Sequence, residues 1–369
     1  MKRVLLFGTF DTIHPGHHAI LREARKYGEV HVCLALDETI QKTKGRPPVH
    51  SLNERQKKLE AFGVAVHPGS GGDKLTVFKE LLPDTVLLGY DQQLFVPELK
   101  TYIRVHKLGT KIIELDPFHP ELFKSKILRR VSEDADSSFL LIDKPSGQPS
   151  FKTIVDLRKI TGIRQIGFAG TLDPIASGLL VCGIAGATQL LDWWHVFPKT
   201  YEATAQLGIE TDTYDSEGTV LSTSKILSTK GQLEKTLKKF TGEIEQKAPV
   251  FSAKKVQGKK MYELAREGKK VTPRKYRVSI KSIELLSYVH PNLQFRVTCS
   301  AGTYIRSLIH DMGETLGSGA AMFALRRLSI GSFSVDNAIT FDALRESDWR
   351  QHTLTIDTLQ ESMMEYLFP

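Results

Sequence analysis

The sequence contains few cysteines and no long hydrophobic run. Its three cysteines, Cys33, Cys182 and Cys299, lie far apart in a chain of 369 residues, so neither a disulfide framework nor a zinc knuckle is expected. No apolar stretch approaches the roughly 18 to 20 residues that a membrane helix needs. The opening MKRVLLFGTFDTIHPGHH breaks its apolar run at Gly8 and differs from a signal peptide. We therefore expect a cytoplasmic protein with reduced thiols and no membrane partner.

Internal repeats and low-complexity tracts are also absent from the sequence. Hydrophobic residues make up 41% and charged residues 25% of the chain, which excludes the composition at which chains stay disordered. Because 369 residues exceed what one hydrophobic core usually serves, we expect two domains.

A change in patterning separates the two halves. Residues 3–116 alternate β-branched or leucine-rich runs with helical patterns, which predicts an α/β domain with a parallel sheet. The second half has longer strands, turns and a few helices, which predicts an α+β domain. The polar segment RRVSEDADSS lies between these halves. We expect domains at 1–130 and 138–369, joined by a linker at 131–137.

The first predicted strand runs into GTFDTIHPGHH, which then continues as a helix. This junction gathers Thr9, His14 and His17 where a helix begins. Unsatisfied helix N–H groups, the helix dipole and two imidazoles would together neutralise a triphosphate there, and Gly16 allows close approach of the backbone. The alternative is that both histidines are structural, because HxGH is a short motif.

Five segments of the first half resemble the cytidylyltransferase-like nucleotidyltransferases: GTFDTIHPGH, KGRPP, ER at 54–55, PDTVLLGYDQ and FKSKI. Of these, LGYDQ is more similar to archaeal-type FMN adenylyltransferases than to glycerol-3-phosphate cytidylyltransferases. The resemblance implies a Rossmann-type, doubly wound sheet that uses ATP or CTP with Mg²⁺, and FMN or another phosphorylated acceptor. It assigns nucleotide binding to Thr9, Phe10, His14, Gly16, His17, Lys44, Arg55, Asp91 and Ser125.

The late motif departs from this family. The family tends to have two hydroxyl residues in succession, whereas Lys124 precedes Ser125 here. A nucleotide-binding or purely structural remnant is therefore an alternative to an active transferase.

In the second half, GFAGTLDPIASG carries one acidic side chain, Asp173, among glycines and apolar residues. Pro174 disfavours helical geometry for the residue before it, so we expect an extended Asp173 with a displayed carboxylate. The surrounding glycines let the backbone turn tightly or approach a ligand. An aspartate that only starts a turn is the alternative. Farther along, Arg306 lies off the apolar stripe of a predicted helix and is free to face a site.

Seven ordered segments resemble the TruB family of tRNA pseudouridine synthases over about residues 138–335: LLIDKPSGQPS, GTLDP, KTYEATAQLG, TDTYDSEG, SAKKVQGKKMYELAREG, GTYIRSL and LRRLSIGSF. The resemblance implies a mixed or antiparallel sheet and isomerisation of uridine 55 in the tRNA T-loop, without cofactor or metal. It implies that Asp173 is the nucleophile, that Tyr201 packs on the base and assists proton transfer, and that Arg306 pairs with the aspartate.

Two features bear on RNA recognition. The family usually reads GHTGTLDP, so Phe168 and Ala169 replace a polar pair, although Phe168 can still fill the gap left by a flipped base. The segment 247–277 carries 11 Lys or Arg against two Glu, and its interleaved aromatic residues favour RNA over a merely solvated helix face. We expect the T-arm to be bound by Phe168, Lys254, Lys255, Lys259, Lys260, Arg266, Lys269 and Lys270.

The tail after GSF, residues 334–369, predicts a closing helix and loop, and is too short for a further RNA-binding domain. The leading hypothesis is a T-loop pseudouridine synthase fused to a nucleotidyltransferase-like domain. Two alternatives stay open. One is a bifunctional enzyme whose first domain is an active FMN adenylyltransferase or cytidylyltransferase, and the other is a non-catalytic tRNA-binding chaperone.

Overall fold

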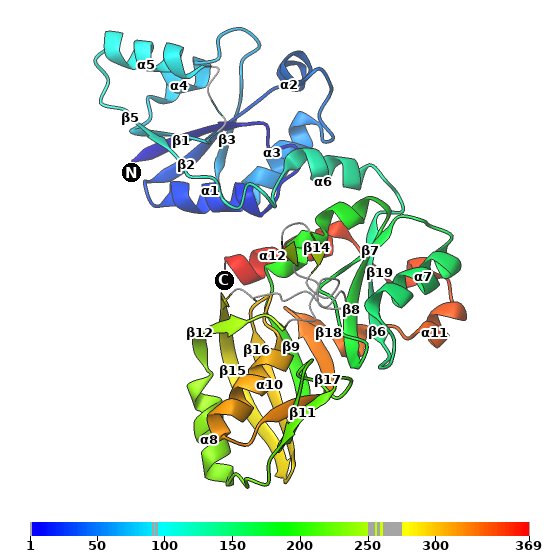
Figure 1. Ribbon diagram of the computed structural model, residues 1–369. Coiled ribbons are helices and arrows are strands. Elements are labelled where there is room, and N and C mark those ends of the chain that lie inside the picture. The colour runs from blue at the N-terminus through cyan, green and yellow to red at the C-terminus, as the bar shows by residue number, and fades with distance from the viewer. Residues whose placement is uncertain are drawn as a thin grey trace. The chain divides into compact units, whose positions relative to one another are not determined.

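The computed structural model describes residues 2–90, 92, 95–249 and 275–368, together with the backbone alone at 255–256 and 259–260. The chain forms two compact units (Figure 1). The first contains Met1–Glu133 and Met363–Pro369, and the second contains Asp134–Ser362. The division after Glu133 falls inside the segment that the sequence analysis treats as a linker.

The first unit is built on a parallel sheet with the strand order β3-β2-β1-β4-β5. Val4 and Leu6 of β1 pack in one hydrophobic cluster with residues of α1 and α3, whereas Leu5 packs in a second cluster with residues of α4 and α5. Helices therefore cover both faces, which confirms the predicted α/β doubly wound fold. The strands are β1 (Arg3–Gly8), β2 (Glu29–Leu34), β3 (Ala65–Pro68), β4 (Thr85–Leu88) and β5 (Lys111–Glu114).

The strand order of this sheet reverses between β1 and β4, and ligands of open parallel sheets bind outside the carboxyl ends of strands at such a point. The helices are α1 (Pro15–Arg25), α2 (Asp37–Lys44), α3 (Leu52–Glu60), α4 (Thr76–Leu81), α5 (Val96–Val105) and α6 (Ser125–Ser132).

The chain's final residues pack within the first unit. The Phe368 ring stacks on His18 with centroids 5.9 Å apart and lies 5.7 Å from the ring of Phe118. The Arg22 guanidinium lies 5.8 Å from the centroid of the same ring. Hydrophobic patterning carries no signal for this grouping, because these residues are distant in sequence from the rest of the unit.

The second unit is built on a mixed sheet with the order β12-β15-β16-β9-β17-β8-β6-β19. The neighbours in this order pair antiparallel, except that β17 and β8 are parallel. The predicted α+β fold with a mixed sheet is thus confirmed. The strands are β6 (Ser138–Lys144), β8 (Ala176–Ile184), β9 (Lys199–Leu207), β12 (Gly242–Lys247), β15 (Lys275–Val289), β16 (Asn292–Cys299), β17 (Ala320–Ile330) and β19 (Thr353–Leu354), with β7 (Ile166–Ala169) beside β8 and β18 (Phe333–Ser334) beside β17.

Two smaller hairpins and several helices complete this unit. The hairpins pair β10 (Ile209–Thr211) with β11 (Val220–Thr223), and β13 (Lys255–Val256) with β14 (Lys259–Lys260). The helices are α7 (Ser150–Thr161), α8 (Lys230–Lys239), α10 (Ile305–Leu316), α11 (Phe341–Arg345) and α12 (Ile356–Leu367), and the 3-10 segments are η1 (Ala185–His195), η2 (Val335–Asn337) and η3 (Trp349–His352). The residues of α12 from Met363 onward belong to the first unit. Within the described ranges, every helix is too short or too polar to cross a membrane.

Helix α10 is held close to the central sheet. Its predicted apolar stripe, which includes Ile305, Leu308 and Ile309, is buried in the main core of the unit. A Cβ on Gly313 would overlap the backbone nitrogen of Ala320, so only glycine allows this contact with the start of β17. The first turn of α10, which carries Arg306, is therefore fixed against the sheet.

We expect the substitution Gly178→Ala to destabilise the second unit. Gly178 has a φ of +98°, and a Cβ there would overlap the Arg327 carbonyl and lie 2.8 Å from the Arg327 nitrogen. The left-handed backbone alone costs a non-glycine residue about 1–3 kcal/mol, and the clash adds to that. Urea unfolding followed by tryptophan fluorescence measures this unit alone, because all three tryptophans lie in it.

Gly231→Ala is the matched control, because a Cβ at Gly231 in α8 meets nothing within 4 Å. It should leave the midpoint unchanged or raise the stability by about 0.5–1 kcal/mol. Equal midpoints for the two variants would contradict this account of the β8–β17 contact.

Candidate active site

Asp173 lies in the loop that joins β7 to β8. On one side of it, the Leu172 N–H donates to Ser150 Oγ at 2.9 Å. On the other side, the Pro174 carbonyl accepts from the Gly147 N–H at 2.8 Å. The Asp173 side chain itself stays 33% exposed. The carboxylate is thus fixed by its neighbours and still accessible.

Arg306 pairs with Asp173 from the first turn of α10. The Arg306 Nε lies 2.9 Å from Asp173 Oδ2, and Nη2 donates to Oδ1 at 3.2 Å. Arg306 is 5% exposed, so this charge is almost removed from water. The structure therefore brings together two of the three residues to which the sequence assigns catalysis.

A second carboxylate, Asp215, holds the same guanidinium. Arg306 Nη1 lies 3.3 Å from Asp215 Oδ2 and donates to the Thr213 carbonyl at 2.9 Å. The other oxygen of Asp215 accepts from the Thr213 hydroxyl at 2.6 Å and from the Glu217 N–H at 3.1 Å. Asp215 is thus buried with both oxygens engaged. Sequence reasoning quoted its motif, TDTYDSEG, but did not single out this residue.

These groups act in opposite directions on the ionisation of Asp173. Partial removal from water raises the pKa of Asp173, and the nearby Arg306 charge lowers it. The Asp215 carboxylate raises the same pKa, and Lys144 lowers it. The net shift is upward, so Arg306 is the main group that keeps this carboxylate available in its charged form.

Tyr201 lies on β9 opposite Arg327 of β17. Tyr201 is 8% exposed, and burial raises its pKa, whereas a hydrogen bond and the charge of Arg327 lower it. Asp173 also lies near enough to raise the pKa of Tyr201. The Arg327 guanidinium donates to the carbonyls of Leu179 and Gly170, at 2.6 and 3.0 Å. Arg327 therefore links Tyr201 to the start of the Asp173 loop.

Lys144, at the end of β6, contacts the loop that carries Asp173 from the interior of the unit. The residue is fully buried, and its Nζ donates to the carbonyls of Pro145 and Gln148 at 2.8 and 2.6 Å, and to Pro174 at 3.4 Å. Burial lowers the pKa of Lys144 to about 8, although Asp173 opposes this shift. Lys144 and Arg327 belong to quoted motifs, but a sequence does not show that such cations are buried.

The predicted RNA-binding residues are only partly described. Phe168 lies half-buried on β7 against the main core. Lys255 lies on β13, and Lys259 and Lys260 lie on β14, but only their backbone is described. The remaining four, Lys254, Arg266, Lys269 and Lys270, lie outside the described residues.

In the first unit, the predicted nucleotide-binding residues meet where β1 leads into α1. His14 Nε2 lies 3.1 Å from Ser125 Oγ, and the His14 and His17 rings lie 3.9 Å apart. The Lys44 ammonium donates to Thr9 Oγ1 at 3.1 Å. The centroid of the Phe10 ring lies 5.1 Å from that of the His17 ring. A Cβ on Gly16 would lie only 3.0 Å from the His14 ring.

The two histidines do not supply the positive charge that sequence reasoning gave them. Burial lowers the pKa of His14 to about 4. Burial, followed by the charges of His14, Lys44 and His18, lowers the pKa of His17 well below its usual value. Both imidazoles are therefore neutral at pH 7, His17 Nδ1 accepts from the His14 N–H at 3.3 Å, and Lys44 is the cation of this cluster.

Arg55 is a correction to the predicted site. The structure buries it completely, and its guanidinium donates to the carbonyls of Thr9, His50 and Ala35 and to Asp37. The residue thus ties α3 to the end of β1 and has no exposed surface for a phosphate. Asp91, the one acidic residue assigned to the nucleotide, lies outside the described residues.

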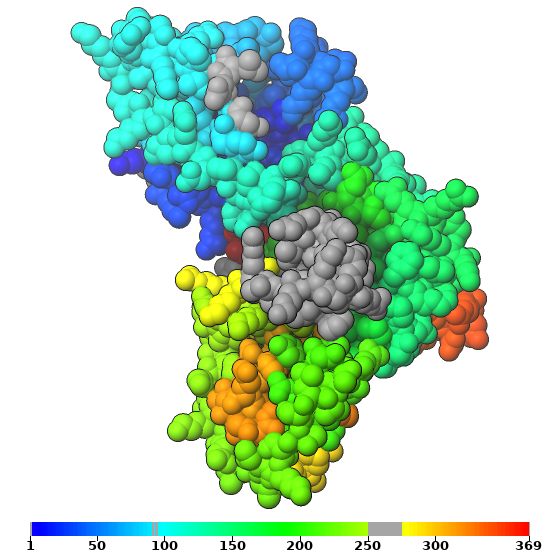
Figure 2. Space-filling view, in the orientation of Figure 1, coloured from blue at the N-terminus to red at the C-terminus, as the bar shows by residue number. Residues whose placement is uncertain are grey.

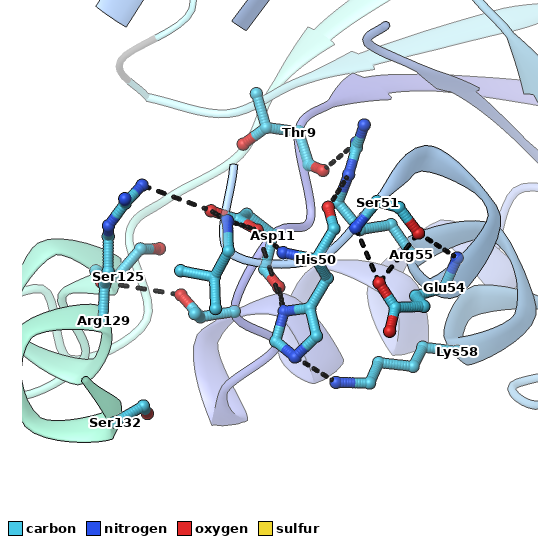
Figure 3. A network of polar contacts seen from close by, with 12 residues as sticks. Thr9, Asp11, His50, Ser51, Glu54, Arg55, Lys58, Ser125, Arg129 and Ser132 are labelled. Carbon is cyan, nitrogen blue, oxygen red and sulfur yellow. Dashed lines mark hydrogen bonds and ion pairs between the residues drawn. The ribbon is translucent and has the colours of Figure 1, made fainter. Parts of the chain in front are cut away.

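A polar network beside these residues involves Asp11, which sequence reasoning did not select (Figure 3). The Asp11 carboxylate accepts from the N–H groups of Val49 and His50, at 2.8 and 3.0 Å. His50 Nε2 lies 2.8 Å from Lys58 Nζ, and Arg129 donates to the Pro47 carbonyl at 2.7 Å and lies 3.9 Å from Asp11. The network holds the KGRPP segment next to the β1–α1 junction.

Three family models match the chain. Residues 158–305 match the TruB family pseudouridylate synthase N-terminal domain, and residues 306–367 match the tRNA pseudouridylate synthase B C-terminal domain. The second match includes the tail that the sequence analysis treats as a closing helix and loop. Residues 5–142 match the cytidylyltransferase-like family. This match confirms the resemblance of the first half to that family.

The chain is also similar to curated relatives and to solved structures. The chain is 49% identical over 201 residues to tRNA pseudouridine synthase B of Protochlamydia amoebophila (strain UWE25), covering 54% of this chain and 76% of the relative. It is 41% identical over 230 residues to the protein of the same name in Clostridium novyi (strain NT), covering 62% and 78%. A Cbf5-Nop10-Gar1 complex contains a chain with a TM-score of 0.49 and 26% identity, covering 66% of this chain and 68% of that one.

The matches to the two curated relatives cover 76% and 78% of their own length. The chain belongs to the TruB family of pseudouridine synthases and carries a cytidylyltransferase-like domain ahead of the synthase.

Proposed function

We propose that the second unit isomerises uridine 55 in the T-loop of tRNA to pseudouridine, with Asp173 as the nucleophile. The observation that carries this proposal is the accessible Asp173 carboxylate held by the buried Arg306 guanidinium. The names of the curated relatives, tRNA pseudouridine synthase B, support tRNA as the substrate.

The reaction breaks the bond between N1 of the base and C1′ of the ribose, rotates the base, and forms a bond between C5 and C1′. C5 loses a proton and N1 gains one. An ionised Asp173 attacks either the ribose or the base, and the bond that it forms breaks again when C5 joins C1′, which returns the carboxylate. Arg306 keeps that carboxylate ionised despite its partial burial. The isomerisation balances without a redox partner, so the chain's own residues suffice for the chemistry.

The target base has to leave the RNA stack before it reaches Asp173, which costs a few kcal/mol. Tyr201 offers an aromatic face against which the base can pack, and such stacking contributes roughly 1–3 kcal/mol per base. Phe168 is the residue that we propose fills the gap in the T-loop. The lysine-rich segment 247–277 would follow the phosphates of the T-arm, which makes tRNA affinity strongly dependent on salt.

We further propose that the first unit binds a nucleoside triphosphate at the junction of β1 and α1. Neutral His14 and His17, the Lys44 ammonium and the N-terminus of α1 form a suitable cluster of donors. Asp11 is occupied by backbone N–H groups, so Mg²⁺ would arrive with the triphosphate oxygens. Transfer of a nucleotide to FMN or another phosphorylated acceptor is the activity that the LGYDQ motif favours.

We expect Asp173→Asn to abolish pseudouridine formation, by on the order of 10⁴-fold or more, while tRNA binding stays within a few-fold of the wild type. The amide keeps the shape of the side chain but has no charge with which to react. Mapping of pseudouridine in tRNA, together with a filter-binding titration, measures both quantities.

Asp156→Asn is the matched control, because Asp156 pairs with Lys152 within α7 at 2.7 Å, outside the cluster around Asp173, and this variant should remain fully active. Activity of Asp173→Asn equal to that of this control would refute Asp173 as the nucleophile. A wild-type protein that binds tRNA and leaves every uridine unchanged would favour the chaperone alternative.

The rate of the reaction should fall as the pH drops through the pKa of Asp173, because the carboxylate is the reactive form. Arg306→Gln removes the charge that lowers this pKa, so the acid limb of the pH–rate profile should move to higher pH. The rate at neutral pH should also drop by about 10²-fold or more, because the carboxylate loses its alignment. Arg306→Lys keeps the positive charge but lacks the planar guanidinium that contacts both oxygens of Asp173. Its rate should therefore fall, while the acid limb of its pH–rate profile stays near that of the wild type.

Release of tritium from tRNA labelled at C5 of uridine, under single-turnover conditions, gives these profiles. Arg296→Lys is the control, since Arg296 pairs with Glu202 at the sheet surface at 2.6 Å. Identical acid limbs for the glutamine and lysine variants of Arg306 would refute the proposed electrostatic role.

For the first unit, we expect the full chain to bind ATP or CTP, and His17→Ala to weaken this binding by about tenfold, the worth of one charge-assisted hydrogen bond. Calorimetric titration measures the affinity, with His106→Ala on the end of α5 as a control outside the cluster. Pyrophosphate release in the presence of Mg²⁺ and FMN or glycerol phosphate then separates a transferase from a domain that only binds. If the chain binds no nucleotide, the proposal for the first unit is wrong, and the alternative of a purely structural remnant holds.

A further inference from the structure

A cluster of metal-binding residue types lies on α10, one turn beyond Arg306. His310, Asp311 and Glu314 each offer one ligand atom, and these atoms lie within 4.8 Å of one another. His310 Nε2 is 3.7 Å from Glu314 Oε1, a separation that an ion bonded to both at about 2.0–2.2 Å would bridge. His310 and Glu314 are four residues apart, the spacing at which helices present two ligands on one face.

His310 itself shows a need for a further partner. The residue is 9% exposed, and its Nδ1 is buried without a hydrogen-bond partner among the described residues. A buried polar atom of this kind is costly, and native structures contain few of them. The carboxylate of Glu210 lies 3.9 Å from Nδ1, which is beyond hydrogen-bonding distance but within reach of a small rotation of the side chain.

The arrangement matches the way in which proteins orient a metal-bound imidazole. A ligating histidine usually donates its second ring N–H to a carboxylate, which fixes the tautomer and the direction of the other nitrogen. Here Glu210 is placed to accept from Nδ1, and Nε2 faces Glu314. The ring of Tyr214 stacks on the imidazole with centroids 3.8 Å apart and an angle of 12°, so it covers one face and restricts the rotation of the ring.

The charge of the cluster also favours a cation. Three carboxylates, from Glu210, Asp311 and Glu314, surround one imidazole, and Lys247 interacts with Asp311 only at longer range. Figure 2 shows the surface of α10, in orange, side by side with the green segment that follows β9. A solvated ion can therefore reach the exposed Glu314, whose side chain is 68% exposed.

We propose that His310 Nε2, Asp311 and Glu314 bind one first-row divalent cation such as Zn²⁺, with Glu210 accepting a hydrogen bond from His310 Nδ1. One imidazole and two carboxylates form a mixed nitrogen and oxygen donor set, which suits such ions better than Mg²⁺ or Ca²⁺, whose ligands are oxygens. Three protein ligands leave at least one coordination position for water.

The site would stabilise the residues that hold Arg306. Tyr214 has a φ of +64°, in the left-handed region, and lies between Thr213 and Asp215. Both of these neighbours contact the Arg306 guanidinium. An ion bound on α10 would fix His310, and through its stack fix Tyr214, in the arrangement that positions Arg306. The ion has a positioning role in this account and does not contact the substrate.

The test uses the untagged full-length chain after extraction with a chelator. Titration with Co²⁺, followed by its visible absorption, and calorimetric titration with Zn²⁺ measure the number of ions and their affinity. We expect one equivalent whose affinity falls by about tenfold or more in Glu314→Gln and in Asp311→Asn, and by about 10–100-fold in Glu210→Gln, which alters a residue that is not itself a ligand. Zn²⁺ should raise the unfolding temperature of the wild type and not that of Glu314→Gln.

His195→Gln is the matched control. His195 lies 3.9 Å from Asp192, three residues earlier on η1, so it forms a histidine–carboxylate pair without a third ligand. This variant should bind the equivalent ion as tightly as the wild type. A wild-type chain that takes up no ion would overturn the proposal, and so would an equivalent that survives both Glu314→Gln and Asp311→Asn, because that ion would be bound elsewhere.

Discussion

The second unit depends on one buried cation that two carboxylates share. Arg306 faces Asp173 with two nitrogens and Asp215 with a third. Removing one partner from a buried ion pair is costly, because the charge left behind has neither water nor a counterion. The loop with Asp173, the segment with Asp215 and the first turn of α10 must therefore adopt compatible positions together. Gly313, which lets α10 approach β17, and Lys144 and Arg327, which anchor the Asp173 loop, all serve this condition.

The sequence was sufficient for most of the fold, because its periodicity reflects burial directly. Strand–helix alternation indicated the parallel sheet of the first unit, and the apolar stripe of α10 appears in the core as predicted. The Asp-Pro dipeptide also indicated a displayed carboxylate, since the constraint that proline imposes is local. Arg306 was found because it lies off the apolar stripe of its helix, and the resemblance to the TruB family supplied its partner.

What the sequence could not show depends on long-range contacts. Arg55 and Lys144 have the same side-chain chemistry as surface cations, yet both are fully buried and donate to backbone carbonyls that are distant in the sequence, including those of Thr9 and Pro174. The same limit applies to His14 and His17. Their identity suggested positive charge, whereas their surroundings keep them neutral. Asp215 was missed because nothing local separates an aspartate that binds a buried arginine from one that caps a turn.

The packing of Phe368 within the first unit has a practical consequence for dissecting the molecule. Since this ring covers His18 and Phe118, a fragment that stops at Glu133 would leave both rings uncovered and would be prone to aggregate. A deletion at the carboxyl terminus would likewise destabilise the nucleotidyltransferase-like unit, although the deleted residues follow the synthase unit in the sequence. Expression of the first unit by itself therefore requires both of its segments, Met1–Glu133 and Met363–Pro369.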